Sequence, residues 1–239
     1  MNVTYIHFDV LDSTNTWTKA HAKSLRNNAF TCVTAGEQTA GIGRFKRPWI
    51  SPQGNLFATF FFTIPLETSY LPNIGQILAY SCATLLQKKG LPALIKWPND
   101  LLIEKKKVAG ILTETVNLSD VLGVVVGIGL NLELTQDALS RINQPATSLA
   151  EMTGKKWDID ELLTSLIEAF LQNLTILQTN GFSLFRDKFN KLLAFMEEEI
   201  TLNSEGQTFC GLCQGVEKDG RLKLLLPSGE ERLFWSGLE

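Results

Sequence analysis

The segment 55–64, NLFATFFFTI, constrains the fold more than any other part of the sequence. Its residues are almost all apolar, whereas a strand with one face in water alternates apolar and polar residues. The segment is therefore expected to be a central strand of a sheet that is covered on both faces. Such a sheet needs helices packed on it.

Local patterns predict the other elements of the first 195 residues. The further strands expected from β-branched and aromatic runs are 3–11, 30–35 and three between Ala93 and Leu132 (LIKW, KKVAGILTETV and VLGVVVGIGLNL), separated by turns at 97–100 and 117–120. The helices expected from apolar spacing are 13–26, opened by Asp12 or Ser13, 70–89, ending at Gly90, 158–178, capped at Asp158, and 182–193, after Gly181. This order predicts an α+β fold in which helices pack on a mixed, hairpin-rich sheet.

The pattern changes beyond Met196, where short strands alternate with tight turns at 217–220 and 227–229. About 44 residues of this kind predict a small C-terminal β-barrel. A length of 239 residues agrees with one large domain and a small companion. We therefore expect domains at 1–195 and 196–239.

Composition and charge exclude several classes of protein. The 22 Lys and Arg residues against 25 Asp and Glu leave a net charge of −3, which is no electrostatic footprint for duplex DNA. The longest strongly apolar run, Val121–Leu130, is far shorter than the roughly 20 residues of a membrane helix. The N-terminus shows no secretory signal, and four scattered cysteines suit a reducing compartment. The sequence predicts a cytoplasmic protein that binds neither nucleic acid nor membrane.

Two other residue types are interpreted as structural. Cys210 and Cys213 form a C-x-x-C pattern, but no second pair or nearby histidine accompanies it, so we expect core cysteines rather than a metal or redox site. His7 falls in a strand pattern and His21 on a helix.

The loop 37–49 is the most informative segment for function. Gly41 and Gly43 let the backbone approach a ligand and point successive N–H groups into a concavity that binds anions, and Arg44 adds a fork-shaped charge. A phosphate cradle is one interpretation, and a mobile surface loop is the other. The loop does not match the Rossmann fingerprint, because the third glycine and the following helix are absent.

Three more segments strengthen the functional interpretation. Residues 13–15 (Ser-Thr-Asn) place hydroxyl and amide groups at a strand-to-helix corner, where a simple N-cap is the alternative. Residues 96–100 (KWPND) combine a cation, an indole, a rigid turn and a carboxylate. Lys107 precedes the small residues Ala109 and Gly110, which allow close approach of a ligand, whereas its two neighbouring lysines are expected to be solvated.

Together these segments resemble the biotin–protein ligase family, also called biotin–[acetyl-CoA-carboxylase] ligases. The matching motifs are S-T-N at 13–15, Q-x-x-G-R-G-R-x-x-R-x-W at 38–49, K-W-P-N-D at 96–100, K-[LIV]-[AG]-G-[IV]-L at 107–112, G-[IV]-G-[IL]-N ending at Asn131, A-T-S-L at 146–149 and G-x-[DE]-x-x-G-x-L at 215–222. These seven motifs occur in the expected order over nearly the whole chain. The resemblance implies a biotin/lipoate ligase-like catalytic domain and an SH3-like C-terminal β-barrel.

The resemblance also implies a two-step reaction. The carboxylate of biotin attacks the α-phosphorus of ATP to give biotinyl-5′-AMP and pyrophosphate, and a lysine amine of a biotin carboxyl carrier protein or domain of a carboxylase then attacks the mixed anhydride. Mg²⁺ is expected with ATP, and its ligands are not predicted. Catalysis is expected to rest on positioning and electrostatic stabilisation, without a nucleophile on the enzyme.

Residue roles are carried over from the matching motifs. The catalytic residues implied are Arg44, Lys107 and Asp100. The biotin-binding residues implied are Ser13, Thr14, Asn15, Gln38, Gly41, Ile42, Gly43, Arg44, Lys107 and Gly110. The ATP-binding residues implied are Arg44, Trp49, Lys96, Asn99, Asp100 and Asn131. Trp49 either packs on the ligand or anchors its loop, and Asn99 and Asn131 are either ATP contacts or structural.

The chain departs from the family pattern at Ile42, where the loop usually carries its first arginine. It is also expected to be a short form without the DNA-binding domain of the repressor members, acting as a monomer or homodimer. Two alternatives remain at this point: a lipoate or octanoate transferase, and a non-catalytic biotin-binding module. Ser13, Thr14 and Gln38 disfavour the first because lipoate would leave their polar groups unpaired, and Lys107, Asp100 and Arg44 disfavour the second.

Overall fold

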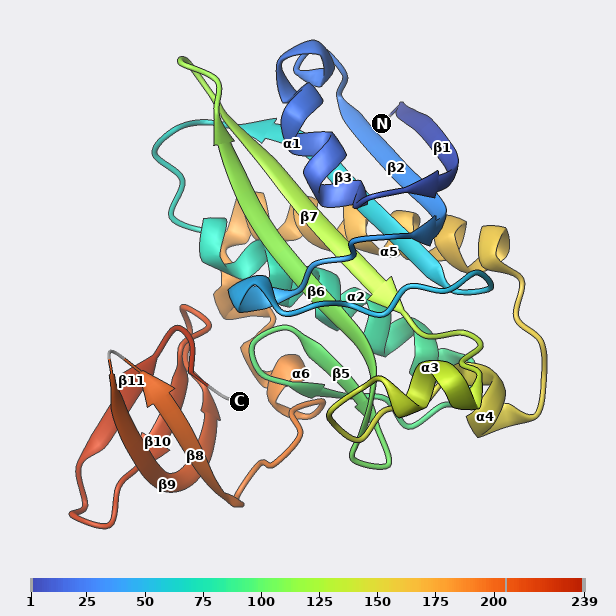
Figure 1. Ribbon diagram of the computed structural model, residues 1–239. Coiled ribbons are helices and arrows are strands. Elements are labelled where there is room, and N and C mark those ends of the chain that lie inside the picture. The colour runs from blue at the N-terminus through green and yellow to red at the C-terminus, as the bar shows by residue number, and fades with distance from the viewer. Residues whose placement is uncertain (1, 205, 238–239) are drawn as a thin grey trace. The chain divides into compact units, whose positions relative to one another are not determined.

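The computed structural model describes residues 2–204 and 206–237. Within them one sheet has seven strands in the order β1-β2-β3-β7-β6-β5-β4 (Figure 1). Its strands are β1 (Val3–Leu11), β2 (Phe30–Gln38), β3 (Leu56–Ile64), β4 (Leu94–Lys96), β5 (Asp100–Ile103), β6 (Lys106–Asn117) and β7 (Leu122–Leu130). β1 and β2 run parallel and the pairs β2–β3, β3–β7 and β6–β7 antiparallel, so the prediction of a mixed sheet is confirmed.

The helices vary widely in length. They are α1 (Thr14–Leu25), α2 (Ile74–Lys88), α3 (Gln136–Ser140), α4 (Leu149–Thr153), α5 (Ile159–Asn180) and α6 (Arg186–Asn190), with 3₁₀ turns η1 (Arg44–Lys46), η2 (Leu71–Asn73) and η3 (Phe182–Leu184). None of the helices in the described part of the chain combines the length and apolar character needed to cross a membrane.

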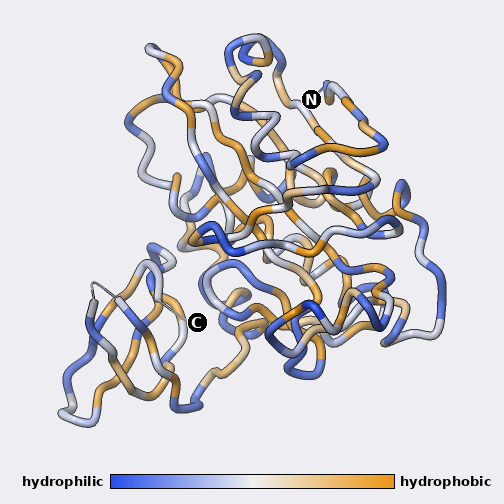
Figure 2. Tube along the Cα trace, viewed as in Figure 1, coloured by the Kyte–Doolittle hydropathy of each residue, from blue (hydrophilic) through white to orange (hydrophobic). Residues whose placement is uncertain are grey.

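β3 is the buried central strand that its composition predicts. Phe61 packs on one face with Leu25 of α1 and Val125 of β7. At the preceding position, Phe60 packs against Phe30 with the rings tilted and their centroids 5.5 Å apart. Successive side chains of a strand point to opposite faces, so both faces of β3 are covered. Figure 2 shows hydrophobic residues along the central strands and hydrophilic residues in the turns.

The chain divides into two compact units. Unit one comprises residues 1–68 and 105–164, and unit two comprises 69–104 and 165–239. Unit two contains a second, antiparallel sheet in the order β11-β10-β9-β8, formed by β8 (Glu199–Ser204), β9 (Gln207–Val216), β10 (Leu222–Leu225) and β11 (Glu231–Phe234). This sheet is consistent with the SH3-like barrel expected for the C-terminus.

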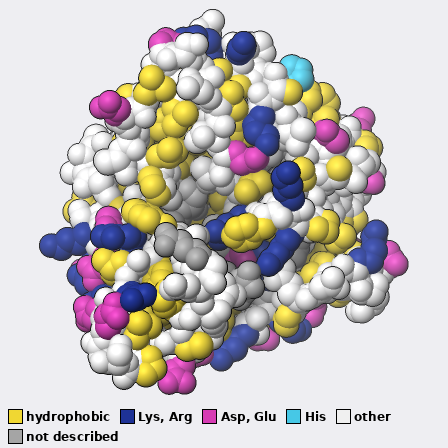
Figure 3. Space-filling view, turned by 60° about the vertical axis from the view of Figure 1, so that its left-hand side comes forward, with side chains coloured by type: hydrophobic (Ala, Val, Ile, Leu, Met, Phe, Trp, Pro, Cys, Tyr) yellow, Lys and Arg dark blue, Asp and Glu magenta, His cyan; other side chains and the backbone are white. Residues whose placement is uncertain are grey.

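The face in Figure 3 carries basic and acidic side chains interspersed with hydrophobic ones, without a continuous basic tract on that face.

The structure corrects the secondary-structure prediction in two places. The segment 100–103 was not predicted as a strand, but it pairs with β4, with Leu94 opposite Leu102. The segment contains three apolar residues after Asp100, a run too short to predict a strand, and pairing within the sheet creates it. The predicted helix 182–193 is instead η3 followed by α6, although Phe182, Phe185 and Phe189 have helical spacing and are all buried.

The cysteine interpretation is half right. Cys213 is buried, but Cys210 is exposed, with its Sγ 3.2 Å from Thr201 Oγ1. Residues three apart in a strand point to opposite faces, so the two thiols of β9 cannot share one site. Among the described residues no group of three or more His, Cys, Asp or Glu side chains could hold a metal ion.

Cys210 is therefore expected to be the one reactive thiol of the folded protein. Burial raises the pKa of Cys32 and of Cys82 to about 12 and also raises the pKa of Cys213, and the thiolate is the reactive form. Iodoacetamide at pH 8 should add one group to the native protein and none to a Cys210→Ser variant, as intact mass will show. Rapid labelling of Cys32 or Cys82 in folded protein would contradict this.

Candidate functional site

The Ser13–Asn15 corner is joined to the end of β2 by direct hydrogen bonds. Ser13 is the N-cap of α1, its Oγ accepting from Thr16 N at 3.4 Å. Thr14 donates twice to Gln38 Oε1, from its backbone N at 2.9 Å and from its Oγ1 at 3.1 Å. Two predicted biotin-binding residues, 24 positions apart, are thus brought together.

Thr59 and Glu114 complete this corner, and sequence analysis did not select them. The hydroxyl of Thr59 lies 2.8 Å from Thr14 Oγ1 and 2.6 Å from Asn15 Oδ1. Asn15 Nδ2 donates to Glu114 Oε2 at 3.0 Å, and Lys19 Nζ forms a 2.6 Å ion pair with Glu114 Oε1. A fully buried hydroxyl needs a partner. Thr59 is one of two threonines in the otherwise apolar β3, and its position among buried aromatic residues was the signal that could have identified it.

Asn15 is engaged at both ends of its amide. Thr59 lies opposite Gly127 in the sheet, and a Cβ on Gly127 would overlap Asn15 Oδ1. The bare glycine backbone therefore admits the Asn15 side chain, which in turn holds Thr14 in place. A direct contact of Asn15 with biotin stays a prediction.

The loop after β2 folds back as a hairpin. Gln38 N donates to Ser51 O at 3.1 Å, Trp49 N to Gly41 O at 2.8 Å, and Gly43 N to Arg47 O at 2.8 Å. The sequence predicts that the Gly43 N–H faces an anion, but in the structure it is paired across the hairpin. A phosphate group would have to compete with the Arg47 carbonyl for this N–H.

Two cations of the loop share one aromatic ring. The guanidinium carbons of Arg44 and Arg47 lie 5.1 and 5.8 Å from the ring centroid of Phe45, which is 71% exposed. Attraction of a guanidinium to a ring face favours this arrangement. Arg47 was not among the selected residues. It places a second arginine beside Phe45, although Ile42 replaces the usual arginine at its own position.

Trp49 packs on two glycines that face each other in the sheet. Gly110 of β6 is the register partner of Gly129 of β7. A Cβ on Gly110 would lie 2.9 Å from Trp49 Cζ3, and one on Gly129 would overlap Trp49 Nε1. Lys107 Nζ lies 5.2 Å from the centroid of the Trp49 ring. The structure therefore supports the anchoring role of Trp49, and brings Lys107 and Gly110 together around it.

The indole N–H of Trp49 is buried, and it has no hydrogen-bond partner among the described residues. A buried donor without a partner is unusual in proteins. The nitrogen lies against Gly129, where an added Cβ would overlap it, so Trp49 acts here as a loop anchor.

The backbone of Lys107 is fixed by the segment before α4. Lys107 N donates to Pro145 O and Thr147 N donates to Lys107 O, both at 2.9 Å. Asn131, which is 3% exposed, donates from Nδ2 to Thr147 O at 3.1 Å. Asn131 therefore supports the segment 145–147, which holds Lys107, and its contact with ATP stays a prediction.

Lys96, Asn99 and Asp100 belong to unit two and form one hairpin there. Lys96 ends β4 directly opposite Asp100, the first residue of β5. Trp97, between them, is 1% exposed, and its Nε1 donates to Gly220 O at 3.1 Å. The KWPND segment is therefore a tight hairpin with a buried indole, and its charged residues lie at the two strand ends.

Comparison with known proteins assigns the family. The model of the biotin/lipoate A/B protein ligase family matches residues 7–131, which contain the Ser13–Asn15 corner, the hairpin loop, the KWPND segment and the two glycines under Trp49. The chain belongs to this family. The resemblance inferred from its motifs is thereby confirmed.

Similar proteins include a ligase named for biotin and a bifunctional ligase/repressor. The chain is 33% identical to the biotin–[acetyl-CoA-carboxylase] ligase of Paracoccus denitrificans, covering 92% of this chain and 93% of the relative. It is 29% identical to the bifunctional ligase/repressor BirA of Bacillus subtilis, covering 98% of this chain and 73% of the relative. A biotin protein ligase from Aquifex aeolicus in complex with biotin and ATP has the same fold, with a TM-score of 0.82, 29% identity and coverage of 98% and 97%. The predicted fold class is confirmed.

Proposed function

We propose that the chain is an ATP-dependent biotin protein ligase that forms biotinyl-5′-AMP and transfers the biotinyl group to a lysine of a biotin carboxyl carrier protein. One observation carries the proposal. A continuous set of contacts runs from Thr14 to Gln38, from Gln38 Nε2 to Ser51 Oγ at 3.0 Å, from Ser51 to the Trp49 carbonyl at 2.9 Å, and from the Trp49 ring to Lys107. This set of contacts links Thr14 and Gln38, which would bind the ureido ring of biotin, to Lys107, which would bind its carboxylate.

In the first step an oxygen of the biotin carboxylate attacks the α-phosphorus, and the bond to pyrophosphate breaks. Lys107 would neutralise the carboxylate and then the acyl-phosphate oxygens, while Arg44 and Arg47 would pair with the phosphate. Fixed cations at developing negative charge are an effective means of lowering such a barrier. In the second step the acceptor amine attacks the acyl carbon, AMP leaves, and the amine loses its proton.

The proposal includes Mg²⁺ as the ion that accompanies ATP. The Asp100 carboxylate and the Asn99 amide oxygen lie at a hairpin end, and both are oxygen donors of the kind that Mg²⁺ prefers. Mg²⁺ bound to ATP would supply charge neutralisation on the phosphates. Asp100 would orient ATP or its metal, or receive the incoming lysine.

Biotin fits the corner better than lipoate or octanoate. Ser13 is 2% and Thr14 4% exposed, so their polar groups depend on partners. A ureido ring can add hydrogen bonds to these polar groups, whereas a dithiolane or an alkyl tail offers none. The polarity of the corner therefore favours biotin.

The proposal also includes a division of the chain and a location. Residues 1–195 would carry biotin and ATP binding, and 196–239 would form the small C-terminal β-domain. A carboxylase carrier domain would be the protein partner, in the cytoplasm. The chain would act as a monomer or homodimer.

Mass spectrometry tests the proposed function directly. Purified protein incubated with biotin, MgATP and a biotin acceptor domain should add one biotin to one acceptor lysine and release AMP. An acceptor with that lysine changed to arginine should gain nothing. Transfer of lipoate or octanoate in place of biotin, or release of no AMP, would refute the proposal.

A further inference from the structure

Three buried side chains donate to two neighbouring carbonyl oxygens of the turn between β9 and β10. Asn73 Nδ2 donates to Asp219 O at 2.7 Å. Gln76 Nε2 and Trp97 Nε1 donate to Gly220 O at 2.8 and 3.1 Å. The three donors are 3%, 2% and 1% exposed, and all five residues lie in unit two. The turn therefore satisfies donors that water cannot reach.

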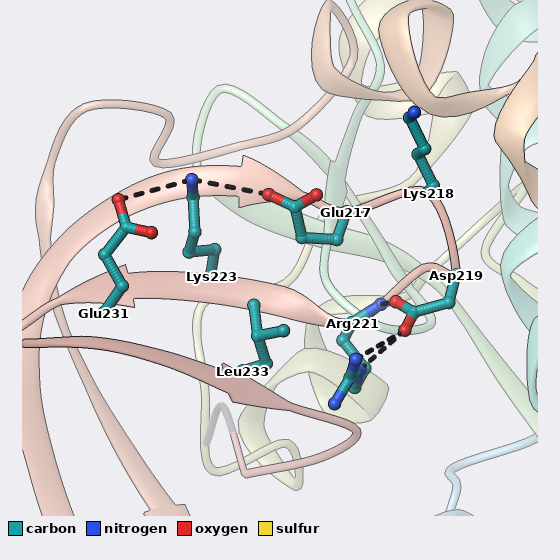
Figure 4. A pocket seen from close by; sticks show the side chains of 7 residues that line it. All are labelled: Glu217, Lys218, Asp219, Arg221, Lys223, Glu231 and Leu233. Carbon is teal, nitrogen blue, oxygen red and sulfur yellow. Dashed lines mark hydrogen bonds and ion pairs between the residues drawn. The ribbon is translucent and has the colours of Figure 1, made fainter.

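The shape of this turn, residues 217–221, is set by bonds of its own. Gly220 N donates to Glu217 O at 2.9 Å and Glu217 N to Arg221 O at 2.8 Å. Arg221 Nε donates to Asp219 Oδ2 at 2.7 Å, and Figure 4 shows this pair on the outside of the turn. The turn is thus preformed, and its inner carbonyls are presented as a unit.

Gly220 permits the contact. Its φ is +90°, a conformation that L residues other than glycine rarely adopt, and a Cβ there would overlap Asn73 Nδ2 and Gln76 Oε1. The backbone itself, rather than a side chain, therefore docks on the buried donors. Without the turn, Gln76 Nε2 and Trp97 Nε1 would lose the acceptor Gly220 O, which is unfavourable for buried donors, whereas Asn73 Nδ2 would keep its bond to Gln76 Oε1 at 2.8 Å.

The C-terminal half of unit two also holds the strand that precedes Trp97. Ile95 N donates to Leu192 O at 2.7 Å, and Ala194 N donates to Ile95 O at 2.8 Å. β4 is the last strand of its sheet, so these bonds secure its outer edge. Both the edge of β4 and the indole that follows it are thus held by residues beyond 190.

We infer that the 217–221 turn is a positioning element for the KWPND hairpin and thereby for ATP. Trp97 is the link, because it occupies the hairpin between Lys96 and Asp100 while its N–H is bound by Gly220. The inference rests on the proposed function, in which Lys96, Asn99 and Asp100 serve ATP. In this inference the turn acts on ATP through the hairpin.

Trp97→Phe tests the inference because it removes the N–H and keeps most of the ring. The KM for ATP should rise about tenfold, equivalent to about 1.4 kcal/mol, while the KM for biotin stays within about twofold. Hydrogen exchange at residues 217–221 should become faster. Trp157→Phe is the matched control, since Trp157 Nε1 donates to Thr153 Oγ1 over the same 3.1 Å but lies outside the hairpin and the turn. It should change neither constant.

Several results would overturn the inference. Three results for Trp97→Phe would each show that Trp97 has only a structural role. The first is unchanged KM values for ATP and biotin, and the second is an equal increase of both. The third is a smaller fraction of active protein whose KM values equal those of the wild type. Gly220→Ala should reproduce the ATP-specific effect from the side of the turn, and a folded Gly220→Ala protein with wild-type KM for ATP would also contradict it. If the wild-type protein forms no AMP from biotin and ATP, the proposed function fails instead, and the calorimetric Kd for MgATP of the same variants then decides the inference.

Discussion

Lys107→Ala is expected to slow formation of biotinyl-5′-AMP about 10²–10³-fold, the usual cost of removing one donor at developing charge. The backbone of Lys107 is held at 2.9 Å on both its N–H and its carbonyl, so the strand should keep its place without the side chain. The contact of Nζ with the Trp49 ring is lost, and the fold should stay intact. Pyrophosphate release in single turnovers, with circular dichroism for folding, measures both expectations.

Lys105→Ala is the matched control for this variant. Lys105 is an exposed lysine in the turn before β6, two residues from Lys107. Its removal should leave adenylate formation within about twofold of wild type, since surface substitutions rarely perturb a site. Equal losses in the two variants, or no loss in either, would show that Lys107 does not act on the substrate.

Gly129→Ala is expected to destabilise the protein by about 1–3 kcal/mol, because the added methyl group overlaps Trp49 Nε1. The indole then has to leave the platform formed by Gly110 and Gly129, and the hairpin loop that ends at Trp49 has to move with it. Chemical denaturation monitored by circular dichroism measures the loss. Affinity for ATP should fall as well, because Trp49 is among the proposed ATP-binding residues.

A double-mutant cycle separates this overlap from other effects of the methyl group. In a Trp49→Ala background the overlap no longer exists, so Gly129→Ala should cost much less stability than it does in the wild-type protein. Equal costs in the two backgrounds would mean that Trp49 does not pack on Gly129 in solution.

The sequence by itself determined the features that depend on neighbouring residues. The apolar composition of β3 predicted a strand covered on both faces, and Phe60 and Phe61 are fully buried. Ser13 was one of two predicted N-caps of α1 and is the one observed. The glycine-containing turns beyond Met196 predicted the C-terminal sheet. The ordered motifs predicted the family, because each is a short contiguous pattern.

Only the tertiary structure decided which of these patterns meet. The position of Trp49 across Gly110 and Gly129 depends on strand register, which pairs two glycines 19 residues apart. Thr59 became part of the corner because β3 lies under α1, and Trp97 met Gly220 across 123 positions. Packing and hydrogen bonding between distant segments depend on distances in space, and a single sequence records only distances along the chain. For the same reason β5 exists as a strand through its pairing within the sheet.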